Sequence, residues 1–305
     1  MIDQEFDAAA IASVNFGVRL RSNGNMHFVP TDGPTKDALK EIFRDTIAIF
    51  NSIPTGWELH DISEDYGNPR RIYAARAGEF MAELSSVFDA GALADLTNLH
   101  DHAHDVEFYF CEFTDAQQRR AVAIKKGTRL KGTLSARNRL MRLVDDTLVL
   151  IEEEVLRLDQ EFDVIVTDPH VFILNVRAVE QIAKIVEHVA ATAAVKVQAI
   201  HDAIPFLDLS RIRDKISRHP RMARNAASIA AHPNLAKFQR PFIETMAAKH
   251  GIKFQELEDG RLQCRVTDEA KLLELLDARR YHLDLAGDGG DPFRASGRQK
   301  VSASG

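Results

Sequence analysis

Apolar and polar residues alternate with a period of two in several short stretches of the first half of the chain, which is the pattern of half-buried β-strands. Residues 14–20 read Val-Asn-Phe-Gly-Val-Arg-Leu, and Ser22-Asn23-Gly24 supplies turn residues before a predicted partner strand at 26–29. Further strands are predicted at 71–75, 106–113, 120–124, 147–152, 162–167 and 171–174. Most of them fall between 106 and 175, which places the main sheet there.

A period of three to four residues replaces this alternation in other regions and predicts helices. The first helix begins at Asp32-Gly33-Pro34, carries an apolar stripe between Leu39 and Phe50, and ends before Pro54. A second helix begins at Asn175, a residue type that caps helices. Its predicted apolar stripe comprises Val179, Ile182, Val186, Val189 and Ala193.

Beyond this stripe the chain is rich in alanine as far as about residue 250 and reads as helix, interrupted by prolines. A hairpin of two short strands, 254–258 and 261–265, is then predicted around the turn Asp259-Gly260. From Gly287 onward the chain is rich in glycine, serine and arginine, and we expect it to be partly ordered at best.

Strands that precede helices, instead of alternating with them, indicate an α+β fold. The sequence predicts a mainly antiparallel sheet at about residues 106–175, a helical C-terminal half and a small N-terminal hairpin-plus-helix region. With 305 residues the chain exceeds the usual size of one domain. We expect an N-terminal α+β region over 1–105 and a second domain over 106–305 with strands, then helices, then a hairpin.

Hydrophobic residues make up 45% of the chain and charged residues 28%, the balance of a globular protein. The N-terminus is acidic from Asp3 onward. It lacks the basic segment followed by an apolar stretch that is typical of a secretory signal. The most apolar helical stretch, 186–200, is interrupted by Lys196 and is shorter than the roughly 20 apolar residues of a membrane-spanning helix. We therefore expect a cytoplasmic protein whose two cysteines, Cys111 and Cys264, are buried free thiols.

Positive charge is concentrated in two blocks, although the formal net charge is −6. The first block, residues 116–144, has a local charge of +9 with no aspartate or glutamate, and the second block, residues 211–240, has a local charge of +7. Across both blocks arginine outnumbers lysine 12 to 5, and the arginine fork matches phosphate geometry bidentately. Such separation of charge destabilises a fold by self-repulsion unless a polyanion or an acidic neighbour faces it.

The backbone of a nucleic acid is a polyanion that fits these blocks, because cations that neutralise phosphates release bound counterions. Phe238 is the one aromatic residue within them, so contact with a duplex backbone is favoured over base stacking on single strands. The candidate DNA-binding residues are Lys125, Lys126, Arg129, Lys131, Arg137, Arg139, Arg142, Arg211, Arg213, Arg218, Arg221 and Arg224. The alternative is that these cations are solvated and pair with acidic stretches such as 152–154 and 159–163.

Two strings resemble metal or catalytic sites. In the stretch from His100 to Asp105, an extended backbone would place His100, His102 and His104 on one side, which makes them weak candidates for a divalent metal site. Glu269-Ala-Lys271 is an E-x-K string of the kind found in nucleases, but it lies on a predicted helix. We find no catalytic constellation and expect no bound metal and no cofactor. A binding protein is therefore expected, with a metal-dependent nuclease as the alternative.

Three stretches carry a resemblance to a known family: Ala121-Val-Ala-Ile-Lys-Lys-Gly-Thr128, the junction Val171-Phe-Ile-Leu-Asn175, and Pro292-Phe-Arg-Ala-Ser-Gly-Arg-Gln-Lys-Val301. Over roughly residues 100–301 and in overall length, the chain resembles the KwaB family, the B subunits of bacterial Kiwa anti-phage defence systems. That family carries a domain of formerly unknown function.

The resemblance implies a DNA-binding effector that acts on double-stranded phage DNA by impeding its replication or expression. It also implies assembly with itself, as a homodimer or a larger homo-oligomer, and with a multi-pass membrane partner subunit, KwaA. The protein would then be cytoplasmic, at the inner face of the membrane through this partner. A structural adaptor without DNA affinity is a further alternative, in which acidic and basic stretches pair between subunits.

Overall fold

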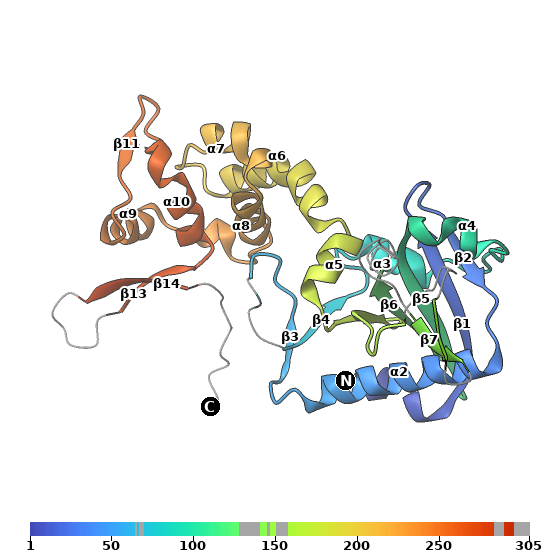
Figure 1. Cartoon of the computed structure of the whole chain (residues 1–305). Helices are drawn as coiled ribbons and strands as arrows, with labels where there is room; N and C mark the ends of the chain where they lie inside the picture. Colours follow the sequence, from blue (N-terminus) through green and yellow to red (C-terminus); the bar gives the residue numbers. More distant parts are fainter. Residues whose placement is uncertain are drawn as a thin grey trace. The chain divides into compact units, whose positions relative to one another are not determined.

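The computed structural model describes residues 1–64, 66, 70–127, 141–144, 147–150, 158–283 and 290–295; for residues 100, 141–144 and 147–150 it describes the backbone alone. The chain forms two compact units (Figure 1). The first unit contains Met1–His60 and Pro69–Ile185. The second unit contains Asp61–Asn68 and Val186–Gly305.

An eight-stranded sheet is the main element of the first unit, in the order β2-β1-β5-β6-β9-β10-β4-β3. Its neighbouring strands are antiparallel, except that β3 runs parallel to β4. The strands are β1 (Ile11–Leu20), β2 (Met26–Val29), β3 (Trp57–Leu59), β4 (Arg71–Ala75), β5 (Val106–Asp115), β6 (Arg120–Lys126), β9 (Val164–Val166) and β10 (His170–Ile173). Because β1 pairs with β5, the N-terminal hairpin extends the main sheet.

The helix α2 (Gly33–Ser52) covers one face of this sheet (Figure 1). Asp32 caps it by accepting a hydrogen bond from the backbone N–H of Thr35, as the sequence predicts for this helix start. Its apolar stripe packs into an aromatic core in which the ring centroids of Phe43 and Phe113 are 4.2 Å apart. The predicted stripe is therefore confirmed as the face that contacts the sheet.

The opposite face of the sheet is covered by α3 (Ala82–Phe88) and α5 (Val176–Ile182), which contact β6. Successive side chains of a strand point to opposite faces, so Phe108 and Phe110 of β5 face away from α2. Both phenylalanines are buried. The unit also has the short helices α1 (Ile2–Glu5) and α4 (Leu99–His102).

Gly17 in β1 lies directly opposite Phe110 in the β1–β5 register. A Cβ atom added to Gly17 would lie 2.3 Å from Cζ of the Phe110 ring. Phe110 is 1% exposed, so its ring has no free space into which to move. The strand therefore requires a glycine at this position for steric reasons.

We predict that Gly17→Ala lowers the free energy of unfolding by about 1–3 kcal/mol, because the methyl group overpacks the sheet. Gly33→Ala is the matched control, since a Cβ at Gly33 meets no atom within 4 Å. This control is expected to be neutral or slightly stabilising. Urea denaturation of the two variants tests the difference, and equal stabilities would contradict the close approach.

A separate two-stranded sheet consists of β7 (Met141–Val144) and β8 (Thr147–Leu150). The strand predicted at 147–152 begins where β8 begins, but β8 pairs with β7 and not with the main sheet. Residues 151–152 of that prediction lie outside the described residues.

The second unit is mainly helical and carries two small hairpins (Figure 1). Its elements, of which α6 starts one residue before the unit, are α6 (Ile185–Ala203), α7 (Ser210–Lys215), α8 (Pro220–Ala230), α9 (Arg240–Lys249), β11 (Phe254–Glu256), β12 (Leu262–Cys264), α10 (Glu269–Leu276), β13 (Arg280–Leu283) and β14 (Asp291–Arg294). The predicted turn Asp259-Gly260 joins β11 to β12, and Gly260 has a φ of 80°. The strands β13 and β14 pair with each other, and neither was predicted.

The helix predicted from Asn175 onward is divided into α5 and α6. Asn175 caps α5 as predicted, with its side chain accepting from the N–H of Ala178. The helix then ends because Lys184 adopts a φ of 49°, in the left-handed region. As a result Val186, assigned to the apolar stripe, is 38% exposed. The prediction of one continuous helix was wrong at this point.

The α+β fold with a mainly antiparallel sheet and a helical C-terminal half is confirmed. The division of the chain into 1–105 and 106–305 stays a prediction; the two compact units divide the chain near residue 185, and the first includes strands from both predicted regions. Both cysteines are buried free thiols, as expected. Burial raises the pKa of Cys264 to about 12.

Candidate nucleic-acid interface

The first basic block is described in part. The structure gives side-chain positions for Arg119, Arg120, Lys125 and Lys126. Arg129, Lys131, Arg137 and Arg139 lie outside the described residues, and of Arg142 only the backbone in β7 is described.

Arg119 and Arg120, at the start of β6, are paired with neighbouring carboxylates. Arg119 Nε donates to Asp115 Oδ2 at 2.7 Å, and the Asp115 side chain is fully buried. Arg120 Nε donates to Glu112 at 3.0 Å, and its guanidinium lies 5.0 Å from the centroid of the Phe88 ring. These two cations therefore stabilise the turn that joins β5 to β6 and contribute little free positive charge.

Lys125 and Lys126, at the end of β6, are both partly buried. Lys125 Nζ donates to Asp163 Oδ1 at 3.1 Å, where the side chains are 13% and 3% exposed. Burial lowers the pKa of Lys126, and Glu107 opposes this shift in part. Their contact with DNA phosphates stays a prediction, but the structure shows that the charge of Lys125 is already matched within the fold.

Two cations of the second block converge on one buried carboxylate. Glu269, at the start of α10, has a side chain that is 3% exposed and forms ion pairs with Lys215 and Arg211 of α7. Arg211 also donates to the carbonyl oxygen of Cys264. This arrangement ties α7 to α10, so Arg211 has a structural role whether or not it contacts DNA.

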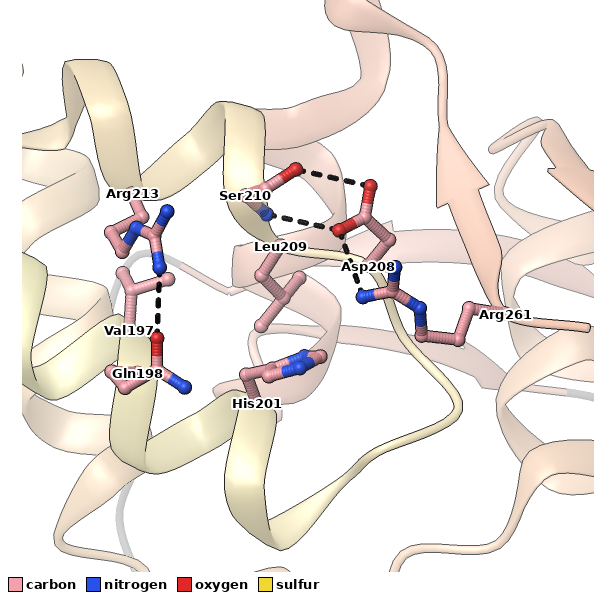
Figure 2. Close-up of a pocket in the computed structure, with 8 residues that line it drawn as sticks. All are labelled: Val197, Gln198, His201, Asp208, Leu209, Ser210, Arg213 and Arg261. Atoms are coloured by element: carbon pink, nitrogen blue, oxygen red, sulfur yellow. Dashed lines mark hydrogen bonds and ion pairs between the residues drawn. The ribbon is translucent and has the colours of Figure 1, made fainter. Parts of the chain in front are cut away.

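Arg213, the next arginine of α7, borders a pocket of about 320 Å³ (Figure 2). The pocket is lined by Val197, Gln198, His201, Asp208, Leu209, Ser210, Arg213 and Arg261. Arg213 Nη1 donates to Gln198 Oε1 at 2.9 Å, and Arg261 Nη1 donates to Asp208 Oδ1 at 3.4 Å. The Arg213 side chain is 44% exposed, and its Nε forms an ion pair with Asp214 at 3.5 Å.

Asp208 is a buried carboxylate that lines this pocket. Burial raises its pKa, but hydrogen bonds from Gln263 and Ser210 and the charge of Arg261 outweigh this effect and leave the pKa below its usual value. Its backbone N–H donates to the carbonyl of Leu262 at 2.8 Å, which joins the start of α7 to β12. The carboxylate is thus ionised and saturated with donors.

The pocket brings a serine, a histidine and an aspartate together, but not as a catalytic relay. Ser210 Oγ donates to Asp208 Oδ2 at 3.1 Å (Figure 2). His201 Nδ1 lies 2.8 Å from the carbonyl oxygen of Leu207, which requires the proton to be on Nδ1. No hydrogen bond joins the serine to the histidine in this described pocket, so the geometry of an activated nucleophile is missing.

Arg218, Arg221 and Arg224 lie where the 3₁₀ turn after α7 leads into α8. Arg218 and Arg221 are exposed, and neither forms an ion pair within the described part of the chain. Arg224 is half-buried and has a partner. Arg218 and Arg221 therefore present positive charge to solvent, a few positions after Arg213 along the chain.

The segment that holds His100, His102 and His104 is helical, with α4 followed by a 3₁₀ turn from Ala103 to Asp105. The expectation of an extended segment with three histidines on one side is therefore wrong. Wherever the structure describes side chains, no group of three or more histidine, cysteine or acidic residues could hold a metal ion. In the E-x-K string, Glu269 is paired as described above and Lys271 donates to Asp268 at 3.0 Å.

Comparison with protein families identifies a match to the family described as "Kiwa protein KwaB-like", over residues 104–285. The matched segment covers more than half of the chain and spans the central strands β5, β6, β9 and β10 together with the helices of the second unit. The chain belongs to the KwaB-like family of Kiwa proteins. Membership makes it an anti-phage defence protein and a component of a Kiwa system.

No curated protein matches the chain, and no solved structure matches it. Among the described residues, no helix has both the length and the apolar character needed to cross a membrane. Of the predicted DNA-binding residues, Arg213, Arg218 and Arg221 are exposed and lie close to one another along the chain. The pocket residues Asp208, His201 and Arg261 were not predicted, because the pairing of the Leu207 segment with β12 has no periodic signature in the sequence.

Proposed function

We propose that the protein is the DNA-binding effector of a Kiwa system, holding the backbone of double-stranded phage DNA and impeding its replication or expression. In this proposal the first phosphate contacts of the second unit are Arg213, Arg218 and Arg221. The cations of the first block that lie outside the described residues, Arg129, Lys131, Arg137 and Arg139, belong to the same proposed contact set.

The observation that carries the proposal is the difference between paired and free arginines within the second block. Arg211 and Lys215 share ion pairs with the buried Glu269, whereas Arg218 and Arg221 are exposed without a described acidic partner. Unpaired surface arginines repel one another unless a polyanion binds them. In an anti-phage protein, the phosphate backbone of the invading DNA is a polyanion of the required kind.

Membership of the KwaB-like family also supports assembly of this protein with other subunits. We propose that the protein assembles with itself and with the multi-pass membrane subunit of its Kiwa system, KwaA. The cytoplasmic protein would then be held at the inner face of the membrane by that partner.

The test is DNA binding by the purified full chain, measured by fluorescence anisotropy at several salt concentrations with duplex and single-stranded probes. We expect affinity to fall steeply with salt and to be higher for the duplex. The double variant Arg218→Glu/Arg221→Glu should weaken binding to all sequences by about tenfold or more and lower the salt slope by about one per lost contact.

The matched control is Lys253→Glu/Arg265→Glu, which changes the net charge equally. Both residues are exposed, lie in the second unit and are outside the two basic blocks. Equal losses in the two double variants would show a general charge effect and contradict the assigned contacts. Absence of binding at every salt concentration would contradict the function and favour the adaptor. Cleavage of DNA with magnesium or manganese would favour the nuclease, which no described residue supports.

A further inference from the structure

A groove with an apolar floor lies between α9, the end of α10 and β13 in the second unit. It is not lined by the arginines that were predicted from the sequence to bind DNA. Its volume is about 610 Å³. The groove is lined by Lys237, Phe238, Gln239, Phe242, Ile243, Met246, Leu275, Leu276, Ala278, Arg280 and Tyr281. Most of these side chains are apolar, and they come from elements of the same unit (Figure 1).

Large apolar side chains at this groove are exposed to solvent. Phe242 of α9 is 68% exposed, and Tyr281 of β13 is 45% exposed. Tyr281 stacks on Phe293 of β14, with ring centroids 5.6 Å apart, and Phe293 is itself 41% exposed. A contiguous exposed apolar surface of this kind marks an interaction site in a folded protein.

The charged residues that line the groove are both cations. Arg280 is matched by Glu274, a buried carboxylate 2.8 Å from its Nη2 atom. Lys237 is exposed and has no ion-pair partner among the described residues. A ligand that fills the groove therefore meets an apolar floor and, at its border, the cation Lys237. Complementarity favours a ligand that carries apolar side chains beside carboxylates.

The apolar floor of the groove favours some classes of ligand over others. Ile243, Met246 and Leu276 offer no hydrogen-bond partner, so the polar edges of nucleic-acid bases would lose their hydrogen bonds to water without replacement. A concave groove fits a narrow convex ligand better than a broad bilayer surface. An amphipathic helix places apolar residues three and four positions apart along one face and suits such a groove.

We propose that this groove binds an acidic amphipathic helix of a partner protein. Phe242 and Tyr281 contact the apolar face of that helix, and Lys237 pairs with its carboxylates. We expect this interaction to be separate from DNA binding, because Arg213, Arg218 and Arg221 do not line the groove, although Lys237 lies in the second basic block.

The experiment uses the full-length protein and a fluorescent peptide of about 15 residues, with leucines three and four positions apart and glutamate or alanine elsewhere. The comparison peptides are a scrambled sequence of the same composition and a version with lysine in place of glutamate. We expect the acidic amphipathic peptide to bind at least about tenfold more tightly than either. Its affinity should fall as salt is added, because the Lys237 contact is exposed.

Phe242→Asp should weaken binding of this peptide about tenfold or more. Val195→Asp is the matched control, since Val195 in α6 is 70% exposed and lies outside the groove. Lys237→Glu should weaken the acidic peptide and strengthen the lysine version. Both aspartate substitutions are at exposed residues. If Phe242→Asp binds DNA with the affinity of the unaltered protein, this variant remains folded.

Equal binding of the acidic and scrambled peptides would overturn the proposal, as would an unchanged affinity in Phe242→Asp. Binding to anionic phosphatidylglycerol vesicles or to single-stranded oligothymidine that is lost in Phe242→Asp, with no peptide binding, would overturn it in favour of a membrane or a nucleic acid. A loss of DNA binding in Arg218→Glu/Arg221→Glu with intact peptide binding would support separate sites.

Discussion

Replacing Arg279 with methionine is expected to lower the free energy of unfolding of the second unit by about 3–5 kcal/mol, because it breaks a buried ion pair. Arg279 is 1% exposed, and its Nε donates to Asp277 Oδ2 at 2.8 Å. The Asp277 side chain is fully buried. Loss of the guanidinium removes a charged partner of this carboxylate, and a buried charge that loses a partner is poorly solvated.

Arg279 also connects distant parts of the second unit. Its Nη2 donates to Ser63 Oγ at 2.7 Å, and its backbone carbonyl accepts from the N–H of Ala295 at 2.8 Å. The side chain therefore contributes to holding the segment around Ser63, which precedes β4 in the chain, against the helical part of the same unit. The expected loss should be confined to this unit.

Hydrogen exchange measured by mass spectrometry tests this prediction unit by unit. Peptides from 186–283 should lose protection in Arg279→Met, while peptides from β5 and β6 keep it. Arg221→Met is the control, because Arg221 is exposed and its replacement should change stability by less than about 0.5 kcal/mol. Arg279→Met combined with Asp277→Leu should recover part of the loss, since it also removes the buried carboxylate. Equal protection in Arg279→Met and Arg221→Met would contradict the role of the pair.

Local elements of this fold follow from the sequence because their signals are local. The period of two places β4 at Arg71–Ala75, the residues predicted, and the apolar stripe of α2 lies against the sheet as predicted. The turn at Asp259-Gly260 is likewise specified by its own residues, because Gly260 readily adopts a positive φ. In each case the deciding interactions lie within a few residues along the chain.

The sheet topology depends on contacts between distant residues and was predicted less completely. Nothing in the β1 pattern indicates that it pairs with β5, about 90 residues later in the chain. The parallel pairing of β3 with β4 was also not predicted, because β3 has only three residues. The break at Lys184 escaped prediction because the apolar stripe continues through it with helical spacing.

The candidate site likewise has features that the sequence predicts and features that depend on contacts between distant residues. The two basic blocks are visible in the sequence, but the partners that neutralise their cations are not. Lys125 meets Asp163, 38 positions away, and the fold brings Lys215 to Glu269. The sequence therefore predicts where positive charge is concentrated, whereas the structure shows which cations remain free to contact phosphate.

Asp163→Ala is expected to destabilise the first unit by about 3–5 kcal/mol, because it removes the partner of a buried lysine and an acceptor of several donors. The Asp163 carboxylate accepts from Lys125 Nζ at 3.1 Å, from the backbone N–H of Lys126 at 2.8 Å and from Asn175 Nδ2 at 3.0 Å. These contacts join the end of β6 to the start of α5. Alanine leaves all three donors unpaired, and Lys125 is only 13% exposed.

Asp168→Ala is the matched control, five positions further along the same hairpin. The Asp168 side chain is 87% exposed, and its pair with Arg76 at 3.2 Å should contribute less than about 1 kcal/mol. Urea denaturation monitored by the fluorescence of Trp57, the one tryptophan and a residue of β3, reports on this unit. A loss in Asp163→Ala no larger than that in Asp168→Ala would contradict the prediction. The expected result means that Lys125→Ala also weakens the fold, so any loss of DNA affinity in that variant must be separated from unfolding before Lys125 is assigned to phosphate.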